Sequence, residues 1–168
     1  TQDTTPPRIV SWGIDMSHRY VNITFDEAVA HSSNYASYYL LLRDPSDTQS
    51  AQRYLLTSST TNGNGNTIKI QISEEDINAV NIQNKLLCYT GNDCFLSVRA
   101  NSIKDISYRN NKFAGILFKF AYEVDIYISD VVPPHLVSYE FSLQSGEMWM
   151  HFDEMIDCNL IDMTRFQL

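Results

Sequence analysis

Asp130-Val-Val-Pro-Pro-His-Leu-Val-Ser-Tyr139 repeats a stretch that the chain has already used near its start, Asp3-Thr-Thr-Pro-Pro-Arg-Ile-Val-Ser-Trp12. Residues 3–41 align with residues 130–168 at an offset of 127 without a gap, and nine of the 39 aligned positions are identical. The identical residues are Asp3, Pro6, Pro7, Val10, Ser11, Phe25, Asp26, Glu27 and Leu41. Self-similarity at a fixed spacing is the signature of a repeat protein. We therefore expect a tandem repeat with a period of 127 residues, with a complete unit at 1–129 and the N-terminal strands of a second, incomplete unit at 130–168.

The second unit is short for a folded body. About three strands are too few to bury a core. Either the visible sequence stops inside a longer chain, which we expect, or another chain completes the unit by strand addition. Pro6-Pro7 and Pro133-Pro134 fix extended backbone without N–H donors, so we expect each pair to act as a linker or as the entry to a first strand.

Composition and charge exclude several classes of partner. The 168 residues are 43% hydrophobic and carry a formal net charge of −8. An acidic chain without a run of Lys or Arg argues against nucleic acid and anionic membranes. No apolar run approaches about 18 residues, so we expect no membrane insertion.

The pattern of apolar and polar residues predicts strands. Residues 20–25 alternate cleanly, with Val21, Ile23 and Phe25 on one side. Further strands are expected at 8–14, 38–43, 52–57 and 67–72, as a hairpin-like pair around Cys88 and Cys94, and within the long apolar run 113–128. About seven short strands separated by turn signals predict an all-β fold, an antiparallel β-sandwich.

Two further segments depart from this pattern. Residues 58–66 consist of Ser, Thr, Asn and Gly, which predicts an exposed loop. Ser73 is followed by three acidic residues, a typical N-cap with acids in the first helical turn. We therefore expect one short helix at 74–81.

Three cysteines bear on location. Cys88 and Cys94 enclose the turn-forming sequence Tyr-Thr-Gly-Asn-Asp, and we expect a disulfide between them rather than two reduced thiols. Their spacing does not fit a zinc site. Cys158 is left over, with a partner expected either elsewhere in the second unit or in another molecule. A disulfide indicates an oxidising, extracellular setting. The N-glycosylation acceptor tripeptide Asn22-Ile23-Thr24 agrees with that setting.

The opening and the end of the second strand resemble a known family. Asp3-Thr-Thr-Pro-Pro and Phe25-Asp26-Glu27-Ala28-Val29 are similar to signatures of tandem immunoglobulin-like repeats in large secreted or cell-surface proteins, such as adhesins and filament or flagellar-hair (mastigoneme-type) proteins. Asp26 stands where that family usually has Ser. Residues 95–111 resemble the family's Leu-x-Leu…Val-x-Asp…Gly-Asn loop, with Asn110 in place of Gly. The resemblance implies an immunoglobulin-like β-sandwich that carries no chemistry of its own.

Acidic residues recur at matching places and suggest a cation site. If strand ends and linkers meet at the joint between units, several carboxylates could supply the six to eight oxygens that Ca²⁺ takes. These candidates are Asp26, Glu27, Asp105, Asp125 and Asp130. The alternative is a set of solvated turn carboxylates.

No pattern of catalytic residues is visible, and we expect no enzyme. His18, His31, His135 and His151 are scattered, and neither a Gly-x-Ser-x-Gly nor a Cys/His signature accompanies them. Aromatic residues offer either a sugar-stacking or fibre-packing surface or ordinary sandwich filling, which we favour. The residues concerned are Tyr35, Tyr38, Tyr39, Tyr54, Tyr108, Tyr127 and Trp149.

Together these features predict an extracellular structural repeat that builds a surface fibre or filament. Its partners would be neighbouring repeats of the same chain and other copies or fibre subunits. An adhesive module that binds carbohydrate, or binds in a calcium-dependent way, is the alternative from another class. An accessory domain of a large extracellular enzyme is a third.

Overall fold

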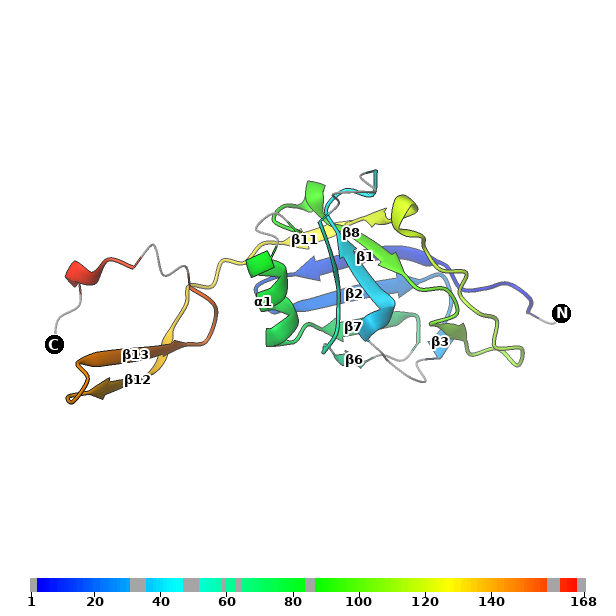
Figure 1. The fold of residues 1–168 in the computed structure, drawn as a ribbon. Coiled ribbons are helices and arrows are strands. Elements are labelled where there is room, and N and C mark those ends of the chain that lie inside the picture. The colour runs from blue at the N-terminus through cyan, green and yellow to red at the C-terminus, as the bar shows by residue number, and fades with distance from the viewer. Residues whose placement is uncertain are drawn as a thin grey trace. The chain divides into compact units, whose positions relative to one another are not determined.

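A computed structural model describes residues 3–30, 36–46, 52–58, 60–62, 65–83, 87–156 and 161–165. Contacts divide the chain into two compact units, Thr1–Asp130 and Val131–Leu168. Within the described ranges the chain is mostly β-strand with one α-helix, which confirms the expected all-β class (Figure 1).

The first unit contains a five-stranded sheet. Its order across the sheet is β11 (Ile126–Ile128), β1 (Ile9–Asp15), β2 (Tyr20–Phe25), β7 (Thr67–Gln71) and β6 (Thr60–Asn62). Neighbouring strands are antiparallel except β1 and β11, which run parallel. The chain can therefore return to β1 only after a long excursion, because parallel strands need a crossover connection.

A four-stranded antiparallel sheet completes the framework. Its order is β10 (Tyr122–Glu123), β8 (Phe95–Val98), β4 (Tyr39–Leu42) and β5 (Arg53–Leu55). Two short strands, β3 (Val29–Ala30) and β9 (Lys104–Asp105), pair separately. The 3₁₀ turns are η1 (Ala36–Tyr38), η2 (Gly91–Asp93) and η3 (Phe118–Phe120).

The core lies between the two larger sheets, and Figure 1 shows β8 over the strands of the five-stranded sheet. The inward residues of β2 that the alternation predicted, Val21, Ile23 and Phe25, are all buried. They belong to one cluster with Leu41 of β4 and Leu96 of β8. Each such side chain contributes about 1.5–3 kcal/mol when fully buried. The period-2 pattern therefore fixes which face of each strand points inward.

Trp12 joins the two sheets. Its indole N–H donates to the carbonyl oxygens of Tyr122 and Glu123 at 3.0 and 2.9 Å, and its side chain is 2% exposed. Its backbone N–H donates to Asp125 Oδ2 at 2.9 Å, while the Asp125 N–H returns a bond of 3.0 Å to the Trp12 carbonyl. The chain leaves β10 of one sheet and enters β11 of the other at this point.

Helix α1 (Glu74–Gln83) starts where the N-cap pattern predicted and runs two residues further than expected. Ser73 Oγ accepts the backbone N–H of Asp76 at 3.1 Å, which satisfies one free donor of the first turn. The fully buried Asp76 carboxylate accepts bonds from the Thr57 backbone N–H and the Tyr54 hydroxyl. The helix start is thereby tied to the segment after β5.

Two sequence predictions were wrong. The expected loop 58–66 contains strand β6, because its Thr-rich segment pairs with the edge of β7. The expected hairpin at Cys88–Cys94 is a loop with the 3₁₀ turn η2, and only its C-terminal side continues into a strand, β8. The final strand expected within the run 113–128 is divided: the turn η3 is followed by β10 and β11, which belong to different sheets.

The second unit is a hairpin of β12 (Leu136–Ser142) and β13 (Glu147–Phe152), followed by η5 (Met163–Arg165). Its register repeats that of β1 and β2 at the offset of 127: Leu136 opposes Phe152 as Ile9 opposes Phe25, and the register shifts after the first pair in both hairpins.

The hydrogen bonds that close the two hairpins correspond as well. The backbone N–H of Arg8 donates to Asp26 Oδ1 at 2.8 Å, and that of His135 donates to Asp153 Oδ1 at 2.7 Å. The N–H of each aspartate returns a bond to the carbonyl of the same basic residue, at 3.0 and 3.1 Å. Two stretches of different sequence thus form the same hairpin.

Trp12→Phe tests the joint between the sheets. The substitution keeps an aromatic ring but removes the N–H, so the partly buried bonds to the carbonyls of Tyr122 and Glu123 are lost. We expect a loss of about 1–3 kcal/mol in the free energy of unfolding, measured by urea titration followed by far-UV circular dichroism. Trp149→Phe, at a position 62% exposed, is the matched control and should stay within about 0.5 kcal/mol of the parent. Equal losses in the two variants would contradict the role of Trp12.

Candidate functional site

Three carboxylates from separate segments converge in the first unit. One oxygen of each of Asp3, Glu27 and Asp105 lies within 4.8 Å of the others. Pairing of β3 with β9 brings the segment after β2 beside Asp105, and the Ile106 N–H donates to the Ala28 carbonyl at 3.2 Å. Asp3 belongs to the segment that enters β1. We call Asp3, Glu27 and Asp105 the acidic cluster.

Asp105 is the organised member of the acidic cluster. It is 0% exposed. Its Oδ1 accepts the backbone N–H of Asn111 at 2.8 Å and the Ser107 hydroxyl at 2.8 Å, and its Oδ2 accepts the Asn111 amide at 2.7 Å. Burial raises the pKa of Asp105, but the bonds from Ser107 and Asn111 outweigh burial and lower the pKa below its ordinary value. Asp105 is therefore ionised and holds the loop 105–111 in place.

Glu27 is the member of the acidic cluster whose ionised form is disfavoured. Partial burial raises its pKa, and the negative charges of Asp3, Asp105 and Asp26 raise it further. A cation placed among these carboxylates would relieve that repulsion. Three carboxylates can offer up to six oxygens, which reaches the lower limit of about six to eight for Ca²⁺. Several lone pairs of Asp105 are already used, so backbone oxygens or water would have to supply the rest.

The acidic cluster contains only part of the set predicted from sequence. Glu27 and Asp105 meet, but Asp26 accepts the Arg8 N–H and Asp125 accepts the Trp12 N–H. Asp130 is exposed at the end of the first unit. Asp3 was not among the predicted ligands, although its recurrence at Asp130 was a visible signal.

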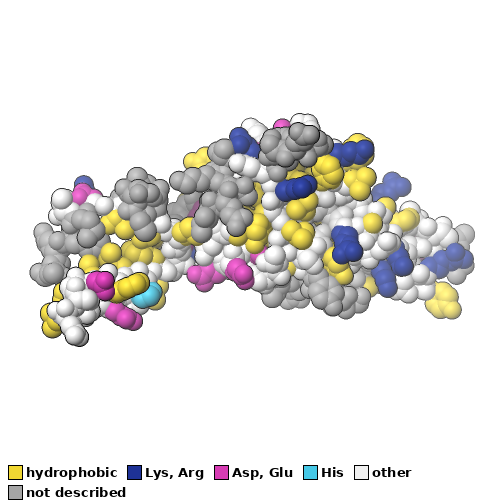
Figure 2. Space-filling model, viewed as in Figure 1, with side chains coloured by type: hydrophobic (Ala, Val, Ile, Leu, Met, Phe, Trp, Pro, Cys, Tyr) yellow, Lys and Arg dark blue, Asp and Glu magenta, His cyan; other side chains and the backbone are white. Residues whose placement is uncertain are grey.

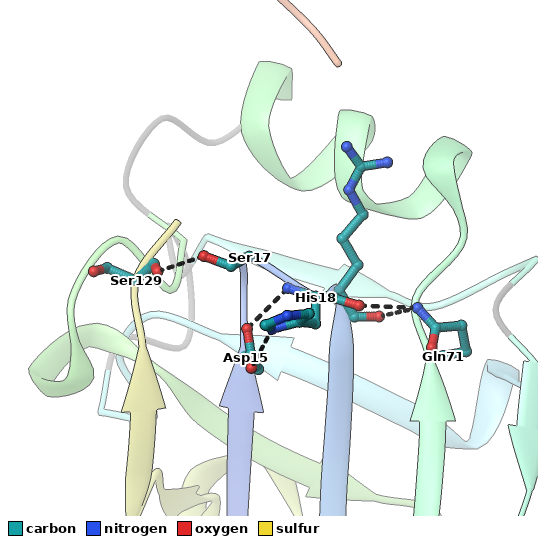
Figure 3. Close-up of polar contacts among 6 residues, drawn as sticks. Asp15, Ser17, His18, Gln71 and Ser129 are labelled. Atoms are coloured by element: carbon teal, nitrogen blue, oxygen red, sulfur yellow. Dashed lines mark hydrogen bonds and ion pairs between the residues drawn. The ribbon is translucent and has the colours of Figure 1, made fainter. Parts of the chain in front are cut away.

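A second polar group organises the turn between β1 and β2 (Figure 3). Asp15 Oδ1 accepts the His18 backbone N–H, and its Oδ2 lies 2.9 Å from His18 Nδ1. Burial raises the pKa of Asp15, yet the bonds from His18 outweigh it and lower the pKa. The Ser17 hydroxyl donates to the Ser129 carbonyl at 3.0 Å, and Gln71 Nε2 donates to the His18 carbonyl at 3.1 Å. These contacts tie the turn to β7 and to the end of β11.

The disulfide between Cys88 and Cys94 is present, as expected. Both cysteines are buried. The Tyr127 hydroxyl donates to the carbonyls of Cys88 and Tyr89 at 2.9 and 2.8 Å, which anchors the disulfide loop to β11. Cys158 lies outside the described residues.

The predicted linker prolines differ in their surroundings. Pro6, Pro133 and Pro134 are exposed, whereas Pro7 is buried in the first unit. The first Pro-Pro pair is therefore partly packed.

The aromatic residues do not form one surface. Tyr39 belongs to the core, Tyr54 is bonded to Asp76, and Tyr108 is exposed. Tyr35 and the histidine His31 lie outside the described residues. His135 contacts Asp153, and His151 is exposed on β13. His18 lies in the β1–β2 turn of the first unit.

An apolar surface on the second unit was not predicted from sequence. Residues of β12 that correspond to core residues of β1 are exposed: Tyr139 is 67% and Phe141 is 50% exposed, whereas their counterparts Trp12 and Ile14 are 2% exposed. Figure 2 shows hydrophobic side chains gathered over this hairpin. The 127-residue alignment and the matching register of the two hairpins both identify these residues as core positions, and the described chain provides no sheet that covers them.

No family model, curated protein or solved structure matches this chain. Among the described residues, no helix is both long and apolar enough to cross a membrane.

Glu27→Gln tests the electrostatics of the acidic cluster. The pKa of Glu27 is higher in the folded state than in the unfolded state. Ionisation of Glu27 therefore lowers the free energy of unfolding as the pH rises from the unfolded-state pKa through the folded-state pKa. Without divalent cations at pH 7, the variant should therefore be more stable than the parent, by less than about 1 kcal/mol. The difference should vanish near pH 3, where Glu27 is protonated.

Melting temperatures between pH 3 and pH 8 in chelator measure this effect, over a range set by the ordinary carboxyl pKa values of about 4. Glu74→Gln, an exposed substitution in the first turn of α1, controls for the change in net charge. A variant less stable than the parent at pH 7 would show that Glu27 is not repelled by its neighbours.

Proposed function

We propose that this chain is an extracellular structural repeat, part of a tandem array of immunoglobulin-like sandwiches that builds a surface fibre or filament. The observation that carries the proposal is the correspondence between the β1–β2 and β12–β13 hairpins. They share the same register, the same register shift and the same closing hydrogen bonds at an offset of 127 residues. A unit that begins again directly after the last strand of the previous one is the arrangement of a linear array.

The strand order supports an immunoglobulin-like sandwich. Such folds place strands A, B, E and D in one sheet and C, F and G in the other. In the five-stranded sheet, β1, β2, β7 and β6 occupy the places of A, B, E and D. In the four-stranded sheet, β4, β8 and β10 occupy those of C, F and G. The final strand is divided, because β11 continues from β10 and pairs in parallel with β1.

The apolar face of β12 and β13 supports repetition. In the first unit the same positions are covered by the four-stranded sheet, and β7 pairs with the free edge of β2. A large exposed apolar surface usually marks an interaction site. In a tandem array, the equivalents of β4, β7 and β8 would cover it. Strand addition from another copy is the alternative source of that cover.

The disulfide between Cys88 and Cys94 supports the extracellular setting, since such bonds persist in oxidising compartments. A rigid sandwich stapled in this way suits a mechanical role. Repetition along a fibre would multiply weak lateral contacts without any single strong site.

Immunogold electron microscopy tests the fibre. An antibody raised against the 168-residue chain should label regular filaments on, or shed from, the cells that produce it. Preincubation with the recombinant chain is the control and should abolish the label. Gold confined to unassembled material, with the cell surface and filaments bare, would overturn the structural role. Label on isolated flexible surface strands would favour an adhesive role instead.

A second candidate function is calcium binding within the repeat. The acidic cluster favours it, because three segments bring carboxylates together, and burial and that proximity both raise the pKa of Glu27. A bound cation would cross-link the entry to β1, the end of β2 and the loop after β9. The unit would thereby become stiffer, which suits a fibre in a calcium-containing medium.

Isothermal titration of the chain with Ca²⁺ tests this candidate. We expect one site per chain, with the affinity reduced at least about tenfold in the double variant Asp3→Asn/Glu27→Gln, since each change removes an anionic ligand. Glu74→Gln/Glu75→Gln removes the same charge from the exposed start of α1 and should bind like the parent. Equal loss in both double variants would mean that only general attraction to an acidic surface is measured.

A further inference from the structure

The outer face of the five-stranded sheet carries a groove of about 220 Å³. Its floor is β1 at Gly13, and its walls are formed by Ile126 and Ile128 of β11 on one side and by Tyr20 and Asn22 of β2 on the other. The registers place Ile126 opposite Gly13 and Gly13 opposite Asn22. One row across the three strands therefore contains the apolar side chain of Ile126, the position of Gly13, which has no side chain and leaves a gap, and the amide of Asn22.

The gap exists because β11 passes close to β1. A Cβ atom at Gly13 would lie 3.0 Å from both Cβ and the carbonyl oxygen of Ile126. A side chain there would fit only if the neighbouring strand moved by a few tenths of an ångström, so the close approach favours glycine. The absence of that side chain opens the floor of the groove directly beside Asn22.

The walls of the groove are well defined. Lys69 Nζ lies 3.9 Å from the centroid of the Tyr20 ring, which holds the ring by a cation–π contact. On the other side Ile126 is 63% exposed although it lies in a strand. An exposed isoleucine next to an empty floor leaves apolar surface for a ligand that lies flat on the sheet.

Asn22 and Thr24 both face outward on β2, and Asn22 is exposed. Asn22-Ile23-Thr24 is the one Asn-x-Ser/Thr tripeptide in the sequence with x other than Pro. Exposure on the outward face leaves room for a sugar without loss of any core contact. Chemistry at this tripeptide is therefore compatible with the fold.

We propose that Asn22 carries an N-linked glycan whose first N-acetylglucosamine lies in this groove, over Gly13 and against Ile126. The inference rests on the proposed extracellular role, because such glycans are added in the secretory pathway. The co-reactant is a lipid pyrophosphate-linked oligosaccharide together with its transferase. The Asn22 amide nitrogen bonds to the anomeric carbon, the bond from that carbon to the phosphate oxygen breaks, and the amide loses one proton while the lipid pyrophosphate leaves.

The size of the groove fits a tethered sugar better than a free ligand. It is smaller than the roughly 300–1,000 Å³ of pockets that hold diffusible molecules. A covalently attached ring needs little affinity, since its effective concentration at the sheet is high. The apolar face of the sugar would cover Ile126, and its polar groups would face the hydroxyls of Ser11 and Thr24 that also line the groove.

The second unit provides an internal contrast. At the offset of 127, Gly13 corresponds to Glu140 and Asn22 to Trp149, and these two residues oppose each other in the β12–β13 register. That hairpin has neither the acceptor nor the gap. The glycan is accordingly specific to the first unit.

The first part of the test is secretion of the whole 168-residue chain from a eukaryotic host. Intact mass should show one N-linked glycan, removed by peptide N-glycosidase and absent from Asn22→Gln and Thr24→Ala. An unmodified chain, secreted by a host that glycosylates a control protein, overturns the proposal. This result does not depend on whether the chain builds fibres, so it leaves the proposed function untouched.

The second part tests the groove. Endoglycosidase trimming leaves a single N-acetylglucosamine, which should raise the melting temperature by about 2–4 °C over Asn22→Gln. Ile126→Ser should remove most of that increment. Val10→Ser, at a position also 63% exposed but outside the groove, should retain it.

NMR provides a readout that a general stability effect would not move. Nuclear Overhauser contacts should join the N-acetylglucosamine to the Ile126 methyl groups. Absence of these contacts, together with an equal rise in melting temperature in Ile126→Ser and in the parent, would show that the glycan does not occupy the groove.

Discussion

The first unit depends on the crossing of its last strand from one sheet to the other. At that crossing the backbone leaves one sheet ladder before it joins the other, and a buried polar group left unpaired costs about 1–3 kcal/mol. Trp12 of β1 provides hydrogen-bond partners there. Its indole N–H donates to the carbonyls of Tyr122 and Glu123 before the crossing, and its backbone forms two hydrogen bonds with Asp125. The Val124 N–H donates to the Cys94 carbonyl, so the disulfide loop is held at the same point.

Parallel pairing of β11 with β1 follows from that crossing and shapes the outer surface. Because β11 lies against Gly13, the sheet has a gap beside Asn22, and because it continues to Ser129, the turn at Ser17 can hold its end. A constraint that arises in the core therefore decides where a ligand or a glycan has room. The β12–β13 hairpin has the same register within its own strands, yet Tyr139 and Phe141 at the core-equivalent positions are exposed, since a hairpin alone cannot cover its own inner face.

The acidic residues divide into those that organise loops and those that repel one another. Asp15, Asp76 and Asp105 are buried and surrounded by donors, which is how a carboxylate is stabilised away from water. The pKa of Glu27, in contrast, is raised by partial burial and by the negative charges of three neighbouring acids. Sequence reasoning found Glu27 and Asp105 because acids recur at strand ends. It could not rank them, because the ranking depends on which loop donors each carboxylate meets after β3 and β9 have paired.

The sequence by itself determined the strand positions with a clean period of two, the capped start of α1, the disulfide and the 127-residue internal correspondence. Each of these follows from spacing along the chain: side-chain alternation, capping chemistry or a short turn. Only the tertiary structure decided that 113–128 is divided between two sheets, that 60–62 joins β7 as a strand, and that Asp3 lies beside Asp105. These outcomes depend on contacts between residues far apart in the chain. The physical reason is that apolar runs and Thr-rich segments are compatible with several pairings, and the partner strand selects among them.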